Sequence, residues 1–220
     1  MENLHPYEQN DVAARIAGQT LANRRPDYSG EVRRLLDAGR EVMRQRGTSS
    51  RPRVADIVQA SGLSNDAFYR HFVSKDALVA AILEDGMERL RSYLAHQMAK
   101  EDSPEGQVRR WVEGVLAQGA DDDGAATLAV LWNAGTLGQA VGSPPLSPSA
   151  PLAALLLEPF VALGSDRPEL DAMLVAHAMV GRLTDHLWQR SRPDPAELDR
   201  LVAFSIATAT RTPESVPPTR

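Results

Sequence analysis

Residues 53–78 read RVADIVQASGLSNDAFYRHFVSKDAL, and this stretch decides the fold of the first part of the chain. Apolar residues recur at helical spacing on both sides of a Ser-Gly-Leu break at 61–63, which predicts two short helices joined by a tight turn. Gly62 suits that turn, where we expect a side chain to obstruct the chain. Ser64 and Ser74 stand where they can cap the second short helix and the helix that follows it. The pattern is therefore that of a helix-turn-helix.

The second short helix, expected over 64–71, has a face of polar and small residues that a packed core does not require. Asn can make two hydrogen bonds to adenine, Arg can make two to guanine, and an Ala methyl group can touch that of thymine. Tyr and His can reach phosphates or base edges, and Asp can accept from cytosine or favour the helix N-terminus. The candidate DNA contacts on this helix are Ser64, Asn65, Asp66, Ala67, Tyr69, Arg70 and His71.

Two cations flank the motif. Lys75 falls in the first turn of the next helix, where its ammonium group adds to backbone amides that already favour an anion. Arg53 stands at the start of the preceding helix, within reach of the DNA backbone. Taken singly, each aromatic or charged residue of the motif is better explained by a core or a solvent role than by DNA contact. The prediction of DNA binding therefore depends on the ordered set.

That ordered set resembles the DNA-binding signature of the tetracycline-repressor (TetR) family of regulators. The family combines a turn Gly, a capping Ser, a Tyr-x-His-Phe group, a Ser-Lys pair and a Leu. The matching residues here are Gly62, Ser64, Tyr69, His71, Phe72, Ser74, Lys75 and Leu78. The specific part of the resemblance covers about residues 30–83, and the later helices fit the family only in number and length.

The resemblance also implies roles for single residues. It implies DNA contacts by Asn65, Ala67, Tyr69 and His71, and phosphate binding by Lys75. Two departures stand out: Asp66 occupies a position where the family frequently has Gly or Pro, and Ala67 replaces a frequent Thr. These departures leave open which bases are read.

Helical periodicity runs through nearly the whole sequence, which predicts an all-α fold. We expect an N-terminal three-helix DNA-binding domain followed by a helical domain that binds a ligand and dimerises. The expected divisions are a flexible arm at 1–28, the helix-turn-helix domain at 29–75, the C-terminal domain at 76–212 and a disordered tail at 213–220. The expected helices are 29–46 with Ser29 as its cap, 53–60, 64–71, 75–100, 104–119, 122–137, 148–163, 167–191 and 194–211.

The net charge of −5 argues against nucleic-acid binding only if the chain is taken as a whole. Residues 10–75 carry twelve Lys or Arg against seven Asp or Glu, whereas the remainder from 76 onward carries twelve against twenty. The basic part thus coincides with the predicted helix-turn-helix, and such asymmetry is a modest indication of nucleic-acid contact.

A regulator with one helix-turn-helix needs a dimer to bind two half-sites of a pseudo-palindromic DNA operator. Broad apolar stripes on the helices expected at 167–191 and 194–211 predict a homodimer through four helices. Part of each stripe must also pack within the subunit. For a small apolar or amphipathic ligand, the candidate contacts in the C-terminal domain are Met98, Trp111, Trp132, Asn133, Phe160 and His177.

Other function classes are disfavoured. No nucleophile elbow, zinc-protease motif or phosphate-binding Gly-rich loop is present, so we expect no enzyme and no catalytic residue. We expect no metal and no cofactor. The sequence has no Cys, and His177 and His186 lie nine residues apart, which is not a metal-ligand spacing on a helix. The acidic triplet at 121–123 falls at the start of a helix, where negative charge is favourable without a metal. The N-terminus lacks a signal peptide pattern, so we expect a cytoplasmic protein without a membrane partner. The alternative is a helical interaction or adaptor protein with a degenerate helix-turn-helix.

Overall fold

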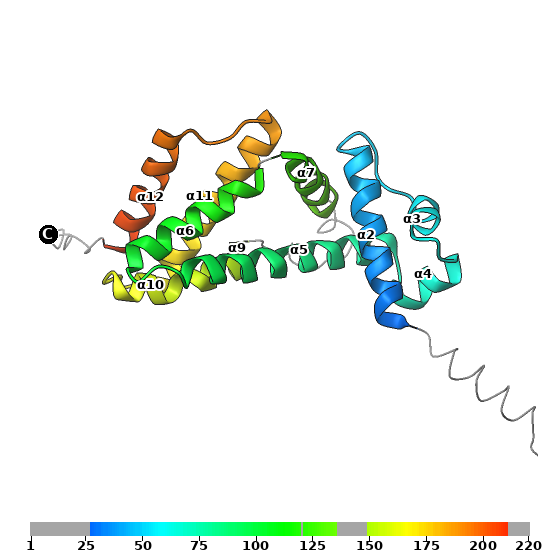
Figure 1. Cartoon of the computed structure of the whole chain (residues 1–220), viewed down its shortest axis with the longest axis horizontal. Coiled ribbons are helices and arrows are strands. Elements are labelled where there is room, and N and C mark those ends of the chain that lie inside the picture. The colour runs from blue at the N-terminus through cyan, green and yellow to red at the C-terminus, as the bar shows by residue number, and fades with distance from the viewer. Residues whose placement is uncertain (1–26, 120, 136–148, 211–220) are drawn as a thin grey trace, which may run out of the picture.

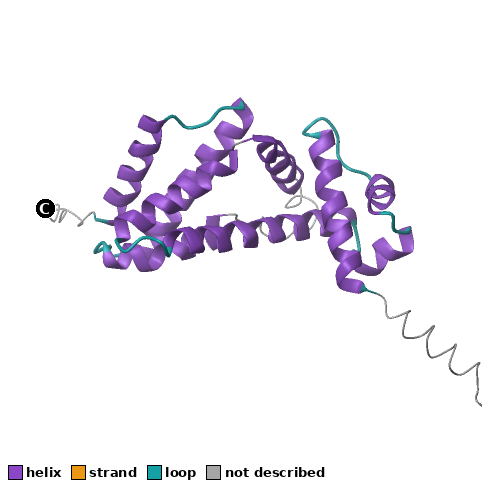
Figure 2. Cartoon of the chain, in the orientation of Figure 1, coloured by secondary structure: helices purple, strands orange, loops and turns teal. Residues whose placement is uncertain are grey.

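The computed structural model describes residues 27–119, 121–135 and 149–210, and every regular element in this part of the chain is a helix (Figure 2). The predicted all-α class is therefore confirmed. The expected arm and tail lie outside the described residues, except for Asp27 and Tyr28 at the end of the arm. Helix α2 begins at Tyr28, one residue before the predicted start of the first helix.

Three helices form the N-terminal unit: α2 (Tyr28–Arg46), α3 (Val54–Ser61) and α4 (Asn65–His71). The cap of α2 is Asp27 rather than the predicted Ser29, because the Asp27 carboxylate accepts a hydrogen bond from the backbone N–H of Gly30 at 2.9 Å. The three helices share a core with the beginning of the next helix. The fully buried side chains of this core are Leu35, Met43, Ile57, Phe68, Leu78, Val79 and Ile82.

Helix α5 (Lys75–Met98) runs from the N-terminal unit into the remaining helices (Figure 1). Its first turns belong to the core of α2–α4, whereas Leu94 and Met98 near its end belong to a second core. The approach of α2 to α5 is close, because a Cβ atom at Gly39 would lie 2.7 Å from Ile82 Cδ1. The two cores are therefore joined by one continuous helix.

The second core is built from helices that follow α5. They are α6 (Pro104–Leu116), the 3-10 turn η1 (Ala117–Gly119), α7 (Asp121–Gly135), α9 (Ser149–Ala153), η2 (Ala154–Leu156), α10 (Leu157–Ala162), α11 (Pro168–Gln189) and α12 (Pro195–Ala209). The single helix predicted over 148–163 is wrong, since this stretch contains two short helices and a 3-10 turn. Pro159 has no N–H to donate four residues back, which breaks the helical hydrogen bonding there.

Helix α7 contacts both parts of the molecule. It packs against α2 and α5 on one side and against α11 on the other. Ala129 and Val130 of α7 are buried in the N-terminal core, while Leu128 packs against the second core. Helices α5 and α7 thus both connect the N-terminal unit with the C-terminal helices.

Candidate functional site

The turn between α3 and α4 has the geometry of a helix-turn-helix. Gly62 ends α3 in the left-handed conformation, with φ of 67°. A Cβ atom there would have no neighbour within 4 Å, so the expectation that a side chain would obstruct the turn is wrong. The backbone conformation is what favours Gly at this position. Ser64 then caps α4 as predicted, because its hydroxyl accepts from the N–H of Ala67 at 3.1 Å.

Helix α4 presents part of the predicted polar face to solvent. Asn65, Asp66 and Arg70 are exposed, and Tyr69 is 57% exposed although its ring packs edge-to-face on buried Phe68. Ala67, in contrast, is only 5% exposed. The prediction that its methyl group faces DNA is therefore wrong, because Ala67 lies on the inner face of the helix.

The end of α4 is tied to the beginning of α2 through Glu31. His71 Nε2 donates to Glu31 Oε2 at 2.7 Å, and Arg70 Nη1 donates to the same oxygen at 3.1 Å. The ring of Tyr28 packs edge-to-face on that of His71, whose side chain is only 10% exposed. The expectation that His71 lies on the exposed face is thus wrong. His71 instead holds α4 against α2.

Glu31 gives this contact a pH dependence. The hydrogen bond from His71 is the main cause that holds the pKa of Glu31 below its usual value of 4.5; partial desolvation opposes it, and the charge of Arg70 adds to it. A carboxyl group whose pKa is lower in the folded state stabilises that state above the unfolded pKa, and the contribution disappears as the pH falls through the folded pKa.

We therefore expect Glu31→Gln to lower the thermal midpoint at pH 7 and the gap between variant and wild type to shrink as the pH falls below about 4.5. Thermal unfolding of both proteins followed by circular dichroism from pH 7 to pH 3.5 measures this gap. Glu84→Gln, at an exposed position of α5, is the matched control. A gap that stays constant over this range would contradict the role given to Glu31.

The two cations predicted beside the motif lie at helix starts. Lys75 is the first residue of α5, where Ser74 accepts from the N–H of Ala77 at 3.1 Å, as expected for the cap. The Lys75 ammonium group lies 3.7 Å from the carboxylate of Asp76, a loose pairing that leaves it available to an anion. Arg53 is exposed, and its backbone N–H donates to Asp56. Asp56 is also paired with Arg46 of α2 at 2.6 Å.

Sequence reasoning missed Val73, which is 88% exposed between α4 and α5. It follows buried Phe72 and precedes the cap of α5, so it lies on the same connection as Lys75. Its apolar side chain fits the periodicity of neither helix. That mismatch is the feature of the sequence that could have identified Val73 as an exposed apolar residue.

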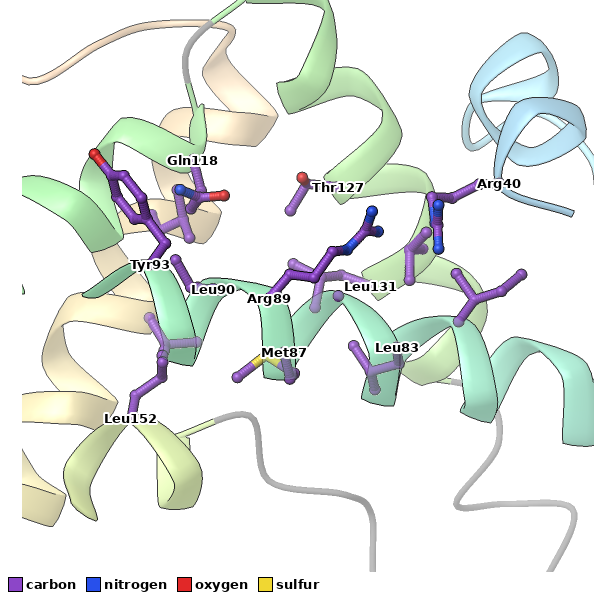
Figure 3. Close-up of a pocket in the computed structure, with 15 residues that line it drawn as sticks. Arg40, Leu83, Met87, Arg89, Leu90, Tyr93, Gln118, Thr127, Leu131 and Leu152 are labelled. Atoms are coloured by element: carbon purple, nitrogen blue, oxygen red, sulfur yellow. The ribbon is translucent and has the colours of Figure 1, made fainter. Parts of the chain in front are cut away.

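A cavity of about 530 Å³ lies between α5 and α7 (Figure 3). Its walls are mostly apolar, with Tyr93 and Gln118 toward one end, Arg40 toward the other, and Thr127 and Arg89 between them. The described residues that line it are Arg40, Ile82, Leu83, Gly86, Met87, Arg89, Leu90, Tyr93, Gln118, Thr127, Val130, Leu131, Leu152, Val180 and Leu183. A cavity of this size and composition can hold a small molecule.

Residues 35–82, from α2 to the first turns of α5, match the family model described as bacterial regulatory proteins, tetR family. This part of the chain is thus similar to the DNA-binding domain of the tetR family. No curated protein matches the chain. The family match spans the helix-turn-helix together with most of α2 and the first turns of α5.

Several solved structures share the fold over most of this chain. A putative TetR-family transcriptional regulator from Mesorhizobium loti MAFF303099 aligns with a TM-score of 0.60 and 15% identity over 83% of this chain and 96% of that one. The fatty acid degradation regulator FadR from Bacillus halodurans aligns with a TM-score of 0.58 and 18% identity over 84% and 95%. A third structure, described as the molecular basis for control of antibiotic production by bacterial hormones, aligns with a TM-score of 0.57 and 21% identity. That alignment covers 80% of this chain and 94% of the other. At these identities the likeness concerns the fold.

The predicted ligand contacts are not among the described residues that line the cavity. Met98, Trp111 and Phe160 are buried in the second core, where Trp111 Nε1 donates to the carbonyl of Leu152 at 3.1 Å. Asn133 is buried and donates to the carbonyl of Ala129. Trp132 is 44% exposed and meets Trp188 edge-to-face. His177 is exposed on α11. None of these six residues lines this cavity, because the large apolar ones fill the second core and Trp132 and His177 lie at the surface; their role as ligand contacts stays a prediction.

An exposed apolar stripe follows α11 and α12 of the TetR-family fold. Leu170, Leu174 and Trp188 of α11 are 45%, 52% and 51% exposed, and Phe204 of α12 is 47% exposed. Gly181 and Ala203 lie exposed along the same helices. No described helix has the length and apolar character needed to cross a bilayer.

Proposed function

We propose that this chain is a TetR-family regulator that binds a pseudo-palindromic DNA operator as a homodimer and is released when a small molecule enters the cavity, so that it acts as a repressor in the cytoplasm. The observation that carries the proposal is the exposed part of α4, where Asn65 and Tyr69 face solvent, together with Lys75 in the first turn of α5. An amide and a phenol suit base edges and phosphates, and an ammonium group suits phosphates.

Dimerisation is proposed through α11 and α12, the predicted pair. Exposed apolar residues of this size rarely gather on a monomeric surface, and two such helices from each subunit would bury them in a four-helix interface. The dimer would then hold two copies of α4 at about 34–36 Å, one turn of DNA, or at a multiple of it.

Ligand control is proposed through the cavity between α5 and α7. Helix α5 begins with Lys75 and lines the cavity further along, so a ligand that displaces α5 also displaces the phosphate-binding end. Because α7 packs on α2, it offers a second route to the N-terminal unit. A coupling free energy of roughly 1–3 kcal/mol between ligand and DNA is typical of such regulators.

Salt dependence tests the DNA-binding proposal against the adaptor alternative. A duplex is first selected from a random-sequence library by the wild-type protein, and its affinity is then measured between 50 and 200 mM salt by fluorescence anisotropy. Phosphate contacts by a dimer are expected to weaken binding by about 10³-fold or more over a range of this kind. Failure to enrich any duplex, or an affinity independent of salt, would favour the adaptor.

A further inference from the structure

The cavity between α5 and α7 is asymmetric in charge. Its only charged residues among the described lining are two arginines, Arg40 and Arg89 (Figure 3), whose guanidinium groups both approach the same carboxylate, that of Asp85. No described carboxylate lines it, and most of the remaining wall is aliphatic. A pocket with this distribution fits a molecule with an apolar body and an anionic head group.

The carboxylates that balance these arginines face elsewhere. Arg40 Nη2 donates to Asp85 Oδ2 at 2.5 Å, Arg89 Nη2 forms an ion pair with the same oxygen at 3.1 Å, and Arg40 Nη1 pairs with Asp37 at 2.9 Å. A second hollow of about 470 Å³ is lined by Asp37 and Asp85 together with both arginines. The two arginines therefore separate two hollows, and the carboxylates line only the second.

Arg40 has a hydrogen-bond donor that no described residue satisfies. Its Nε atom is buried and lacks an acceptor anywhere in the described part of the chain. A buried donor without an acceptor is unfavourable, and a donor on a cation is especially so. An anion that enters the cavity beside Arg40 could supply such an acceptor.

We propose that the effector of this cavity is an amphipathic carboxylate whose head group binds Arg40 and Arg89 and whose apolar body lies along α5. This inference rests on the proposed function of the cavity as the effector site. It adds the chemical class of the effector and the residues that recognise its charge.

The same site supplies a direct path to the DNA-binding unit. Arg40 belongs to α2, whereas Asp85 and Arg89 belong to α5, so the Arg40–Asp85 ion pair joins the two helices. A ligand carboxylate competes with Asp85 for Arg40. Binding of the anion therefore weakens a contact that fixes α2 on α5. If DNA binding requires α2 to be fixed in this way, bound DNA lowers the affinity for the anion by the same factor.

Matched probes of equal chain length test the head group. Decanoate and decan-1-ol are titrated into the full-length protein by isothermal calorimetry at pH 7.5, without DNA. We expect decanoate to bind about tenfold more tightly or better, as charge-assisted hydrogen bonds to an arginine pair imply. Equal affinities, tighter binding of the alcohol, or binding of neither probe would overturn the proposal.

Single variants locate the head group. Arg89→Gln is expected to remove the tenfold preference for decanoate, while Arg91→Gln, which lies on the same helix and pairs with Glu88 outside the cavity, is expected to keep it. Arg89 is 60% exposed, so its replacement should leave the thermal midpoint nearly unchanged, which circular dichroism verifies. Loss of the preference in both variants would show that the net charge matters rather than this site.

A measurement of DNA binding in the presence of decanoate distinguishes the two proposals. Decanoate is expected to weaken binding to the selected duplex in wild type and to have little effect in Arg40→Gln. If wild-type protein selects no duplex, the proposed function fails while the calorimetric preference still decides the anion site. If decanoate binds with the expected preference but leaves DNA affinity unchanged, the coupling through Arg40 is overturned.

Discussion

Simultaneous replacement of Tyr69 and Lys75 by alanine is expected to lower the affinity for the selected duplex by about a hundredfold or more. Each contact to a base or phosphate contributes roughly 1–3 kcal/mol, so the loss of two gives an effect of this order. The fold should survive, because Tyr69 is 57% exposed and Lys75 has only a loose pairing with Asp76 at 3.7 Å.

Anisotropy titration of the double variant measures this loss, and the salt slope should also become shallower because a phosphate contact is gone. Lys100→Ala, which removes an exposed lysine beyond the end of α5, is the matched control and should bind as wild type does. Retained affinity in a folded double variant would mean that this surface does not read DNA, and the adaptor alternative would become the better explanation.

Local chemistry explains why so much of the helix-turn-helix could be predicted. The caps at Ser64 and Ser74 and the break at Gly62 depend on neighbours within three residues, and each lies where the sequence places it. Ala67 and His71 were misplaced because their surroundings come from distant segments. His71, for example, is covered by Tyr28 and Glu31 of α2, forty residues away along the chain. Helical spacing carries no information about such partners.

The cavity was harder to predict for a different reason. Hydrophobicity predicts which side chains are buried, and it correctly indicates burial for Trp111 and Phe160. It does not predict where buried side chains leave a space. The charged wall depends on Arg40, which arrives from the N-terminal unit and stands forty-nine positions before Arg89 of α5. Only the packing of α2 against α5 brings these two cations together.

The second large effect is expected from Gly181→Arg, which should convert the proposed dimer to a monomer. Gly181 is exposed on α11, and a Cβ atom there would have no neighbour within 4 Å inside the subunit. Gly in a helix interior costs roughly 0.5–1 kcal/mol relative to Ala, so the isolated subunit gains nothing from it. In a four-helix interface, however, Gly allows close approach of the partner helix. Arg at this position would insert a bulky charge into that contact.

Sedimentation velocity should therefore report half the wild-type mass for Gly181→Arg, with an unchanged or slightly higher thermal midpoint of the subunit. Because joining two DNA-binding units raises affinity by about 10²–10⁴-fold, a monomer should lose at least a hundredfold in affinity for the two-half-site duplex while keeping weak binding to one half-site. Ser92→Arg, at an exposed position of α5, adds the same charge away from α11 and should remain dimeric. If Gly181→Arg also remains a dimer that binds normally, the interface must lie on another surface, and the exposed stripe of Leu170, Leu174 and Trp188 would need a different partner.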